Sequence, residues 1–141
     1  MIEDMIVFVC DNNACHSIMA QAIFEHLSPR LYAQSAGKYT SFVRSEVKTV
    51  LDEIGILSKG YHSKDEMAID WTDVKLVIQL CDPDWAPFTP SRIPKRQWLL
   101  PDPLAAPKEE RLEACRALRD ELERRIKQIL PEFEQQHRST K

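Results

Sequence analysis

The feature that most constrains the fold is an apolar run near the N-terminus that passes into a polar loop and then into a helical pattern. Residues 5–9 are continuously apolar and rich in β-forming side chains, which is typical of a strand buried on both faces. Residues 10–17 are mostly polar, and apolar residues then recur with helical spacing from Ile18 to Leu27. This order predicts a parallel sheet, because parallel strands need crossover connections of this kind.

The rest of the chain continues the alternation of strands and helices. Further strands are predicted at residues 31–36, 74–80 and 96–100, and further helices at residues 43–54 and 107–131. The crossovers between parallel strands should be right-handed. We therefore expect one α/β domain at residues 1–131, followed by a polar C-terminal tail at residues 132–141.

Composition and charge argue against several classes of function. The 141-residue chain has a net charge of −3, which gives no electrostatic reason to bind nucleic acid or an acidic membrane. Its N-terminus is acidic where a signal peptide needs positive charge, and the apolar run at 5–10 is far too short to span a bilayer. We expect a cytoplasmic protein with reduced thiols.

Three reactive side chains, those of Cys10, Cys81 and Asp102, each fall just past a predicted strand. In an open parallel sheet, ligands bind beyond the C-terminal ends of the strands. The three side chains are therefore expected to meet at one edge. Residues 83–107 hold seven of the nine prolines and should form a long, stiff surface loop system.

The loop at residues 10–17 reads Cys-Asp-Asn-Asn-Ala-Cys-His-Ser. Between a buried strand and a helix start, its backbone N–H groups should converge on an anion-sized hollow. The positive electrostatic field of these N–H groups also favours a thiolate nucleophile at Cys10. The Ser17 hydroxyl is placed to donate a hydrogen bond to the Cys10 sulfur. The alternative is a buried structural cysteine followed by an ordinary turn. The predicted oxyanion-binding loop comprises Asp11, Asn12, Asn13, Ala14, Cys15 and His16.

In this loop the sequence resembles the low-molecular-weight tyrosine phosphatases and thioredoxin-coupled arsenate reductases. Their loop runs Cys, five residues, Arg, Ser, and this chain matches it at Cys10, Asn13 and Ser17. The resemblance reaches Ile129 and implies a three-layer fold around a central four-stranded parallel sheet. Other segments that resemble the family follow in order at residues 19–21, 35–37, 53–56 and 63–64.

Two further segments favour the arsenate reductase branch of the family. Residues 80–82, Leu-Cys-Asp, resemble the strand end that carries the second redox cysteine. Residues 98–103 resemble the Trp-containing Asp-Pro loop of these reductases. The tyrosine phosphatases usually place aromatic residues after this Asp-Pro, whereas residues 104–106 here are Leu-Ala-Ala.

The resemblance implies a mechanism and partners. Cys10 would attack a tetrahedral oxyanion, arsenate or phosphate, and Asp102 would protonate the leaving oxygen. Cys81 would then form a disulfide with Cys10, which thioredoxin, glutaredoxin or glutathione would reduce. No metal and no other cofactor is expected. A role in arsenic resistance would follow.

Two departures from the family pattern predict a weakened oxyanion site. His16 stands where the family has an arginine, which clamps an oxyanion through two parallel charge-assisted hydrogen bonds. Histidine offers one donor, and losing a transition-state donor typically costs about 10²–10³ in rate. Asp11 adds a carboxylate that repels the anion by about 4 kcal/mol, at about 4 Å and an effective dielectric near 20. The alternative is that Asp11 pairs with His16 and keeps it protonated, which would partly restore the clamp. Ordinary phosphatase activity is therefore not expected.

The third cysteine of the reductase relay is also missing. It would fall near Phe88, and no cysteine lies between Asp82 and Ala114. Cys15 is either an alternative disulfide partner or a small buried side chain. Cys115 lies on the apolar stripe of the last predicted helix and is expected in the core.

Two other functions stay open at this point. A catalytically silent binding or regulatory protein is favoured by His16, Asp11 and the missing third cysteine. A soft-metal or arsenite-binding protein would use Cys10, Cys15, Cys81 and His16, because thiolates and imidazole suit such ions.

Overall fold

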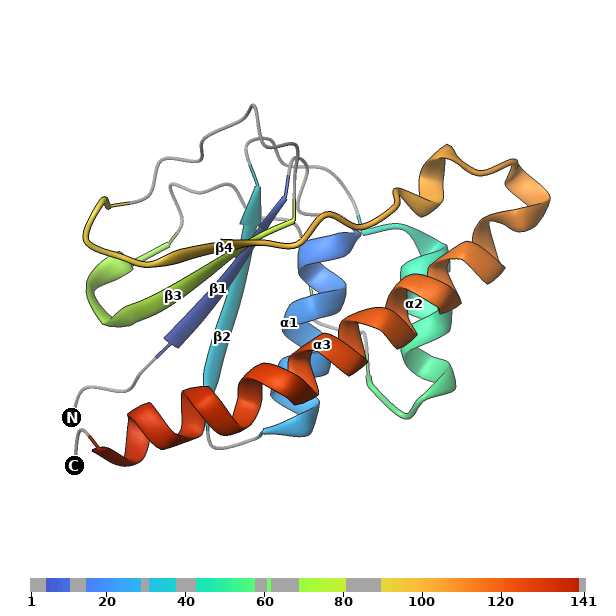
Figure 1. Cartoon of the computed structure of the whole chain (residues 1–141). Helices are drawn as coiled ribbons and strands as arrows, with labels where there is room; N and C mark the ends of the chain where they lie inside the picture. The colour runs from blue at the N-terminus through green and yellow to red at the C-terminus, as the bar shows by residue number, and fades with distance from the viewer. Residues whose placement is uncertain are drawn as a thin grey trace.

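Four parallel strands form the sheet in the order β2-β1-β3-β4, as the computed structural model of the chain shows (Figure 1). The structure describes residues 5–10, 15–28, 31–37, 43–57, 61, 69–80 and 90–139, and the side chains among them up to residue 133. The strands are β1 Met5–Cys10, β2 Tyr32–Gly37, β3 Val74–Gln79 and β4 Lys95–Gln97. The helices are α1 His16–Leu27, α2 Ser45–Glu53 and α3 Arg111–Ser139, with short 3₁₀ turns η2 Trp71–Asp73, η3 Pro103–Ala105 and η4 Lys108–Glu110. The predicted single α/β domain with a four-stranded parallel sheet is confirmed.

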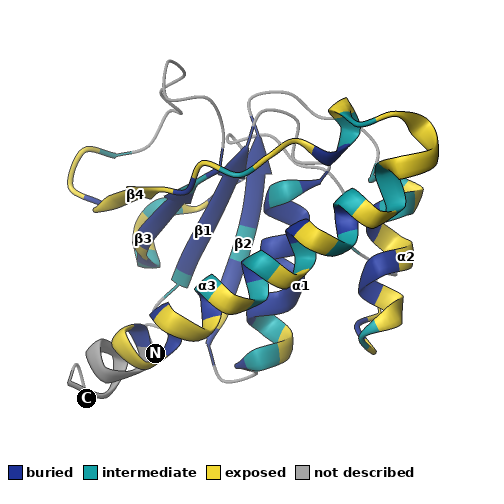
Figure 2. Ribbon diagram, turned by 45° about the vertical axis from the view of Figure 1, so that its right-hand side comes forward, coloured by how far each residue is buried: buried dark blue, intermediate teal, exposed yellow. Residues whose placement is uncertain are grey.

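The two faces of the sheet bury different apolar clusters. Because side chains alternate along a strand, Ile6, Phe8 and Cys10 of β1 face the cluster that holds α1, α2 and α3. Val7 and Val9 face the other cluster, which the chain around η2 and Ile93 covers. Helices, sheet and this thinner cover make three layers, and Figure 2 shows β1 buried at their centre.

Helix α1 packs against β1, β2 and α3, and its residues from Ser17 to Phe24 are buried. The ring of Phe24 meets that of Phe8 edge-on, with centroids 6.0 Å apart. Gln21, a buried residue of α1, accepts a 2.6 Å hydrogen bond from the hydroxyl of Ser35 in β2. These contacts hold α1 against β1 and β2.

The predicted end of the last helix at Pro131 is wrong, because α3 continues to Ser139 with Pro131 inside it. A proline inside a helix costs about 3 kcal/mol. Beyond it, however, the Phe133 ring is buried and meets Phe24 edge-on at 6.0 Å, and burying such a side chain contributes about 1.5–3 kcal/mol. An ion pair between Glu132 and Arg96 also holds this part of α3 against β4. The polar tail at 132–141 stays a prediction, since most of its side chains lie outside the described part.

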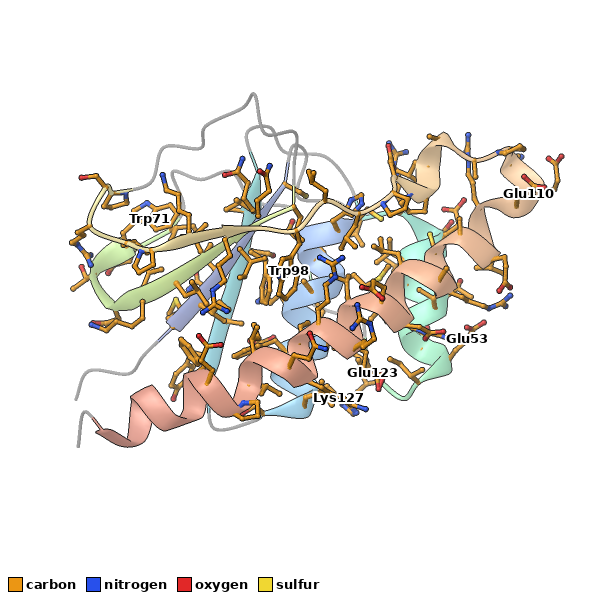
Figure 3. The ribbon with its side chains drawn as sticks, viewed as in Figure 1. Glu53, Trp71, Trp98, Glu110, Glu123 and Lys127 are labelled. Carbon is orange, nitrogen blue, oxygen red and sulfur yellow. The ribbon has the colours of Figure 1, made fainter. Side chains whose placement is uncertain are left out.

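The predicted strand at 96–100 is shorter than expected, since β4 ends at Gln97. The backbone N–H of Trp98 still donates to the Gln79 carbonyl at 2.9 Å, but Leu99 turns outward and is 65% exposed. Pro101 has no N–H to continue a ladder. Trp98 is buried between the sheet and α3, with its ring 6.4 Å from that of Phe8 (Figure 3).

An arginine pair of α3 holds the end of α2. The Glu53 carboxylate accepts hydrogen bonds from Arg116 at 2.7 Å and from Arg119 at 2.8 Å (Figure 3). Arg119 also donates to the Val50 carbonyl at 3.0 Å. The hydrogen bond from Arg116, supported by Arg119, lowers the pKa of Glu53 to about 2.

None of the helices within the described residues is both long enough and apolar enough to cross a membrane.

Candidate active site at the end of β1

The last residue of β1 and the first turn of α1 bring a thiol and a hydroxyl together. Cys10 Sγ lies 2.9 Å from Ser17 Oγ, and both side chains are buried. A serine hydroxyl can donate to a sulfur anion, and a hydrogen bond to a charged group stabilises it by about 1.5–3 kcal/mol. The contact predicted from the spacing of Cys10 and Ser17 is therefore present.

His16, the first residue of α1, contacts the segment that follows β4. Its Nε2 lies 2.9 Å from the carbonyl oxygen of Pro101, in the segment that follows β4. Because a carbonyl oxygen only accepts, Nε2 is the nitrogen that carries the proton. The donor that would replace the family arginine is therefore engaged by the backbone of this segment.

Asp102 follows Pro101, the residue that His16 contacts. Its Oδ1 accepts a 2.9 Å hydrogen bond from the Leu104 N–H, so the carboxylate caps the turn η3. Asp102 is exposed, and beside it a hollow of about 420 Å³ opens between this segment and α3. The apolar lining of the hollow includes Leu100, Pro103 and Leu118.

A third thiol approaches the site from the last helix. Cys15 immediately precedes α1, and Cys115 lies in the first part of α3 with no exposed surface. The two thiols lie within hydrogen-bonding reach of each other, which raises the pKa of Cys15 well above its ordinary value, with burial acting in the same direction. The same hydrogen bond lowers the pKa of Cys115.

Comparisons with known proteins place this geometry in a family. The family model described as low molecular weight phosphotyrosine protein phosphatase matches residues 5–139. This chain belongs to that family. The match runs from β1 to the end of α3, so it includes both segments that meet at Cys10 and Ser17.

Individual members of the phosphatase family with similar sequences are arsenate reductases. The arsenate reductase of Shouchella clausii is 31% identical over 92% of this chain and 96% of its own length. The glutaredoxin arsenate reductase of Synechocystis is 26% identical over 89% of this chain and 95% of its own length. A solved arsenate reductase in the phosphate-binding state is 25% identical, covers 92% of this chain and 98% of its own, and superposes with a TM-score of 0.78.

Part of the family's predicted site lies outside the described residues. This holds for loop residues 11–14, and therefore for the repulsion predicted at Asp11, and for Cys81 with its predicted disulfide to Cys10. Within the described ranges, the end of β1 and the start of α1 bring Cys10, Cys15, His16 and Ser17 together, and Asp102 joins them through Pro101.

The metal hypothesis finds no support in the described part of the chain, where no group of three or more Cys, His, Asp or Glu side chains could hold an ion.

Two contacts of this phosphatase-family site were missed by sequence reasoning. The spacing of His16 gives no sign of its bond to Pro101. Cys115 follows the helical apolar stripe, which predicts its burial but not its neighbour Cys15.

Proposed function

We propose that this chain is an arsenate reductase-like enzyme in which the Cys10 thiolate attacks a tetrahedral oxyanion held by residues 11–16. The observation that supports the proposal most is the buried 2.9 Å contact between Cys10 Sγ and Ser17 Oγ, at the junction of β1 and α1. A hydroxyl beside the sulfur supports Cys10 as the nucleophile that this chemistry needs. The names of the similar reductases point to arsenate as the oxyanion.

The proposed reaction uses three side chains in sequence. Cys10 attacks arsenic, and Asp102 protonates the oxygen that leaves as water. Cys81 then attacks Cys10 Sγ, and the electron pair of the sulfur–arsenic bond reduces arsenic to the trivalent state. The products are arsenite and a Cys10–Cys81 disulfide.

An external thiol must return the disulfide to two thiols for a second turnover. The Synechocystis relative is named a glutaredoxin arsenate reductase, which supports a thiol reductant here. Thioredoxin, glutaredoxin and glutathione are the candidates, and parallel assays with each distinguish them.

The oxyanion clamp is weaker in this protein than in relatives with arginine. His16 directs its Nε2 proton to the Pro101 carbonyl, so this donor does not serve the anion while the bond holds. Asp11 adds a negative charge to the loop. We expect a rate lower by about 10²–10³ than an arginine-containing loop would give.

The test is arsenate-dependent oxidation of reductant by wild type, Cys10→Ser and His16→Arg. The expected result is slow turnover by wild type, none by Cys10→Ser and a gain in His16→Arg. His26→Arg is the matched control, because His26 is exposed at the other end of α1. Arsenate turnover that survives Cys10→Ser contradicts the proposal.

One observation favours a second function, a silent binding protein on the same fold. The bond between His16 and Pro101 replaces an anion clamp with an internal contact. On this account, wild type turns over no arsenate and binds no oxyanion, while His16→Arg restores oxyanion affinity. Turnover by wild type rules this function out.

A further inference from the structure

A second hollow, of about 410 Å³, lies where the start of α2, the turn η3 and the first residue of α3 come together (Figure 1). Its volume falls within the range of small-molecule sites, about 300–1,000 Å³. Unlike the apolar hollow beside Asp102, it is lined mainly by charged and polar side chains. The lining residues are Arg44, Ser45, Glu46, Leu104 and Arg111.

The charged side chains of this hollow are two cations and one anion. Arg44 immediately precedes α2 and Arg111 is the first residue of α3, and both are half-buried. A guanidinium group matches a carboxylate with two parallel hydrogen bonds, and partial burial strengthens the attraction because less water screens it. Glu46, in the first turn of α2, supplies the negative charge. The hollow therefore suits a ligand that carries two negative groups and one positive group.

Leu104 connects this hollow to the candidate active site. It lines the hollow, and its backbone N–H donates a 2.9 Å hydrogen bond to Oδ1 of Asp102. Arg111 holds the same segment, because its Nε donates to the Ala106 carbonyl at 3.1 Å. A ligand in the hollow therefore lies against the segment that carries the proposed acid.

We propose that this hollow binds glutathione, with its two carboxylates on Arg44 and Arg111 and its ammonium group on Glu46. The proposal rests on the proposed function, which needs an external thiol, and it names that thiol and the residues that select it. A tripeptide spans about 10 Å when extended, so bound glutathione can reach past Leu104 towards Asp102. A hollow of this size admits a tripeptide but not a folded reductant such as thioredoxin.

The reaction of the bound thiol balances when a second glutathione follows. The thiolate of the bound molecule attacks the disulfide that remains after arsenate reduction, which forms a mixed disulfide with one cysteine and releases the other as a thiolate. A second glutathione thiolate attacks the mixed disulfide, which releases the remaining cysteine and forms oxidised glutathione. The two glutathione molecules lose one electron each, and the protein disulfide gains both.

The experiment is titration calorimetry of the reduced full-length protein with S-methylglutathione, which keeps all three charges and has no thiol to react. We expect binding to wild type that is weakened about 10- to 100-fold in Arg44→Gln and in Arg111→Gln, because each loses hydrogen bonds to a charged group. Arg44→Gln carries the result if loss of the Ala106 contact unfolds Arg111→Gln.

Arg92→Gln is the matched control for the loss of a positive charge. Arg92 is exposed and bonds the Trp71 carbonyl, which belongs to the apolar cluster on the other face of the sheet. It should bind S-methylglutathione as wild type does. No binding to wild type, or equal binding by wild type and both arginine variants, overturns the proposal. Arginine-dependent binding of phosphate without binding of S-methylglutathione overturns it as well, and assigns the hollow to an oxyanion.

Turnover with two reductants separates this proposal from the proposed function. The ratio of kcat/KM with glutathione to kcat/KM with the uncharged thiol dithiothreitol should fall about 10- to 100-fold in Arg44→Gln and stay at the wild-type value in Arg92→Gln. Binding of S-methylglutathione by a wild type that forms no arsenite contradicts the proposed function alone. Arsenite formation without such binding contradicts the glutathione site alone.

Discussion

The imidazole of His16 hydrogen-bonds to the carbonyl of Pro101, 85 residues further along the chain, with Nε2 and O 2.9 Å apart. The bond joins the first residue of α1 to the residue that precedes Asp102. In this phosphatase-family chain the residue that replaces the loop arginine therefore connects the two segments that would hold the nucleophile and the acid.

Removing the His16 donor should loosen the segment that carries Asp102. We expect His16→Ala to lower the free energy of unfolding by about 0.5–1.5 kcal/mol, the net value of one hydrogen bond. Hydrogen exchange of residues 98–106 should become faster. His16→Gln, which can still donate, should keep much of the protection, and equal exchange in all three proteins would show that the bond does not hold this segment.

The hydroxyl of Ser17 should control the reactivity of Cys10. A hydrogen bond to a charged group contributes about 1.5–3 kcal/mol, so Ser17→Ala should slow alkylation of Cys10 near neutral pH by about 10- to 100-fold. The measurement is the rate of iodoacetamide labelling at Cys10, followed by mass spectrometry. Ser28→Ala removes another buried hydroxyl at the far end of α1 and should leave this rate unchanged. If Cys10 is alkylated equally fast in Ser17→Ala and in wild type, the Ser17 hydroxyl does not control the reactivity of Cys10.

Glu53 should make stability depend on pH in the acid range. Hydrogen bonds from Arg116 and Arg119 lower its pKa to about 2, so the folded protein binds this proton less readily than the unfolded chain. The stabilisation from the ionised Glu53 carboxylate is therefore fully present above the pKa range of an ordinary glutamate. It is lost as the pH falls through about 2. Denaturant unfolding should show the difference between wild type and Glu53→Gln shrinking from about pH 5 to about pH 2.

Glu109→Gln is the control for this pH dependence, because Glu109 is exposed in η4. A loss of stability difference seen for Glu53→Gln and not for Glu109→Gln assigns the effect to the arginine pair. A flat difference for Glu53→Gln as well would show that the Glu53 carboxylate gains nothing from the two arginines.

Phe133 should be required for stability although it follows Pro131. Truncating a buried phenylalanine costs about 3–5 kcal/mol, so Phe133→Ala should lower the denaturation midpoint strongly. Lys127→Ala, at an exposed position of the same helix, should change stability little. A small effect of Phe133→Ala would mean that the helix contributes nothing after Pro131.

The sequence predicts the part of the fold that local patterns determine. The apolar run of β1 and the helical spacing of α1 predict a strand, a loop and a helix in that order. The parallel sheet follows from the alternation of strands and helices along the chain. The contact of Cys10 with Ser17 is predictable for the same reason, since both flank one short loop.

What the sequence could not reveal depends on contacts between distant segments. Pro131 gives a local signal to end the helix, and the burial of Phe133 against Phe24 outweighs it. The hydrogen bond of His16 to Pro101 and the hydrogen bond of Cys115 with Cys15 join segments that are far apart in the sequence. The local sequence of neither segment predicts the contact.

The central claim, that Cys10 reduces arsenate, is tested most directly by one single-turnover measurement. Fully reduced protein is mixed with arsenate in the absence of external reductant, and arsenite is quantified by arsenic speciation. The account predicts arsenite in an amount that approaches the amount of wild-type protein and none with Cys10→Ser. No arsenite from wild type, or equal arsenite from Cys10→Ser, would contradict it.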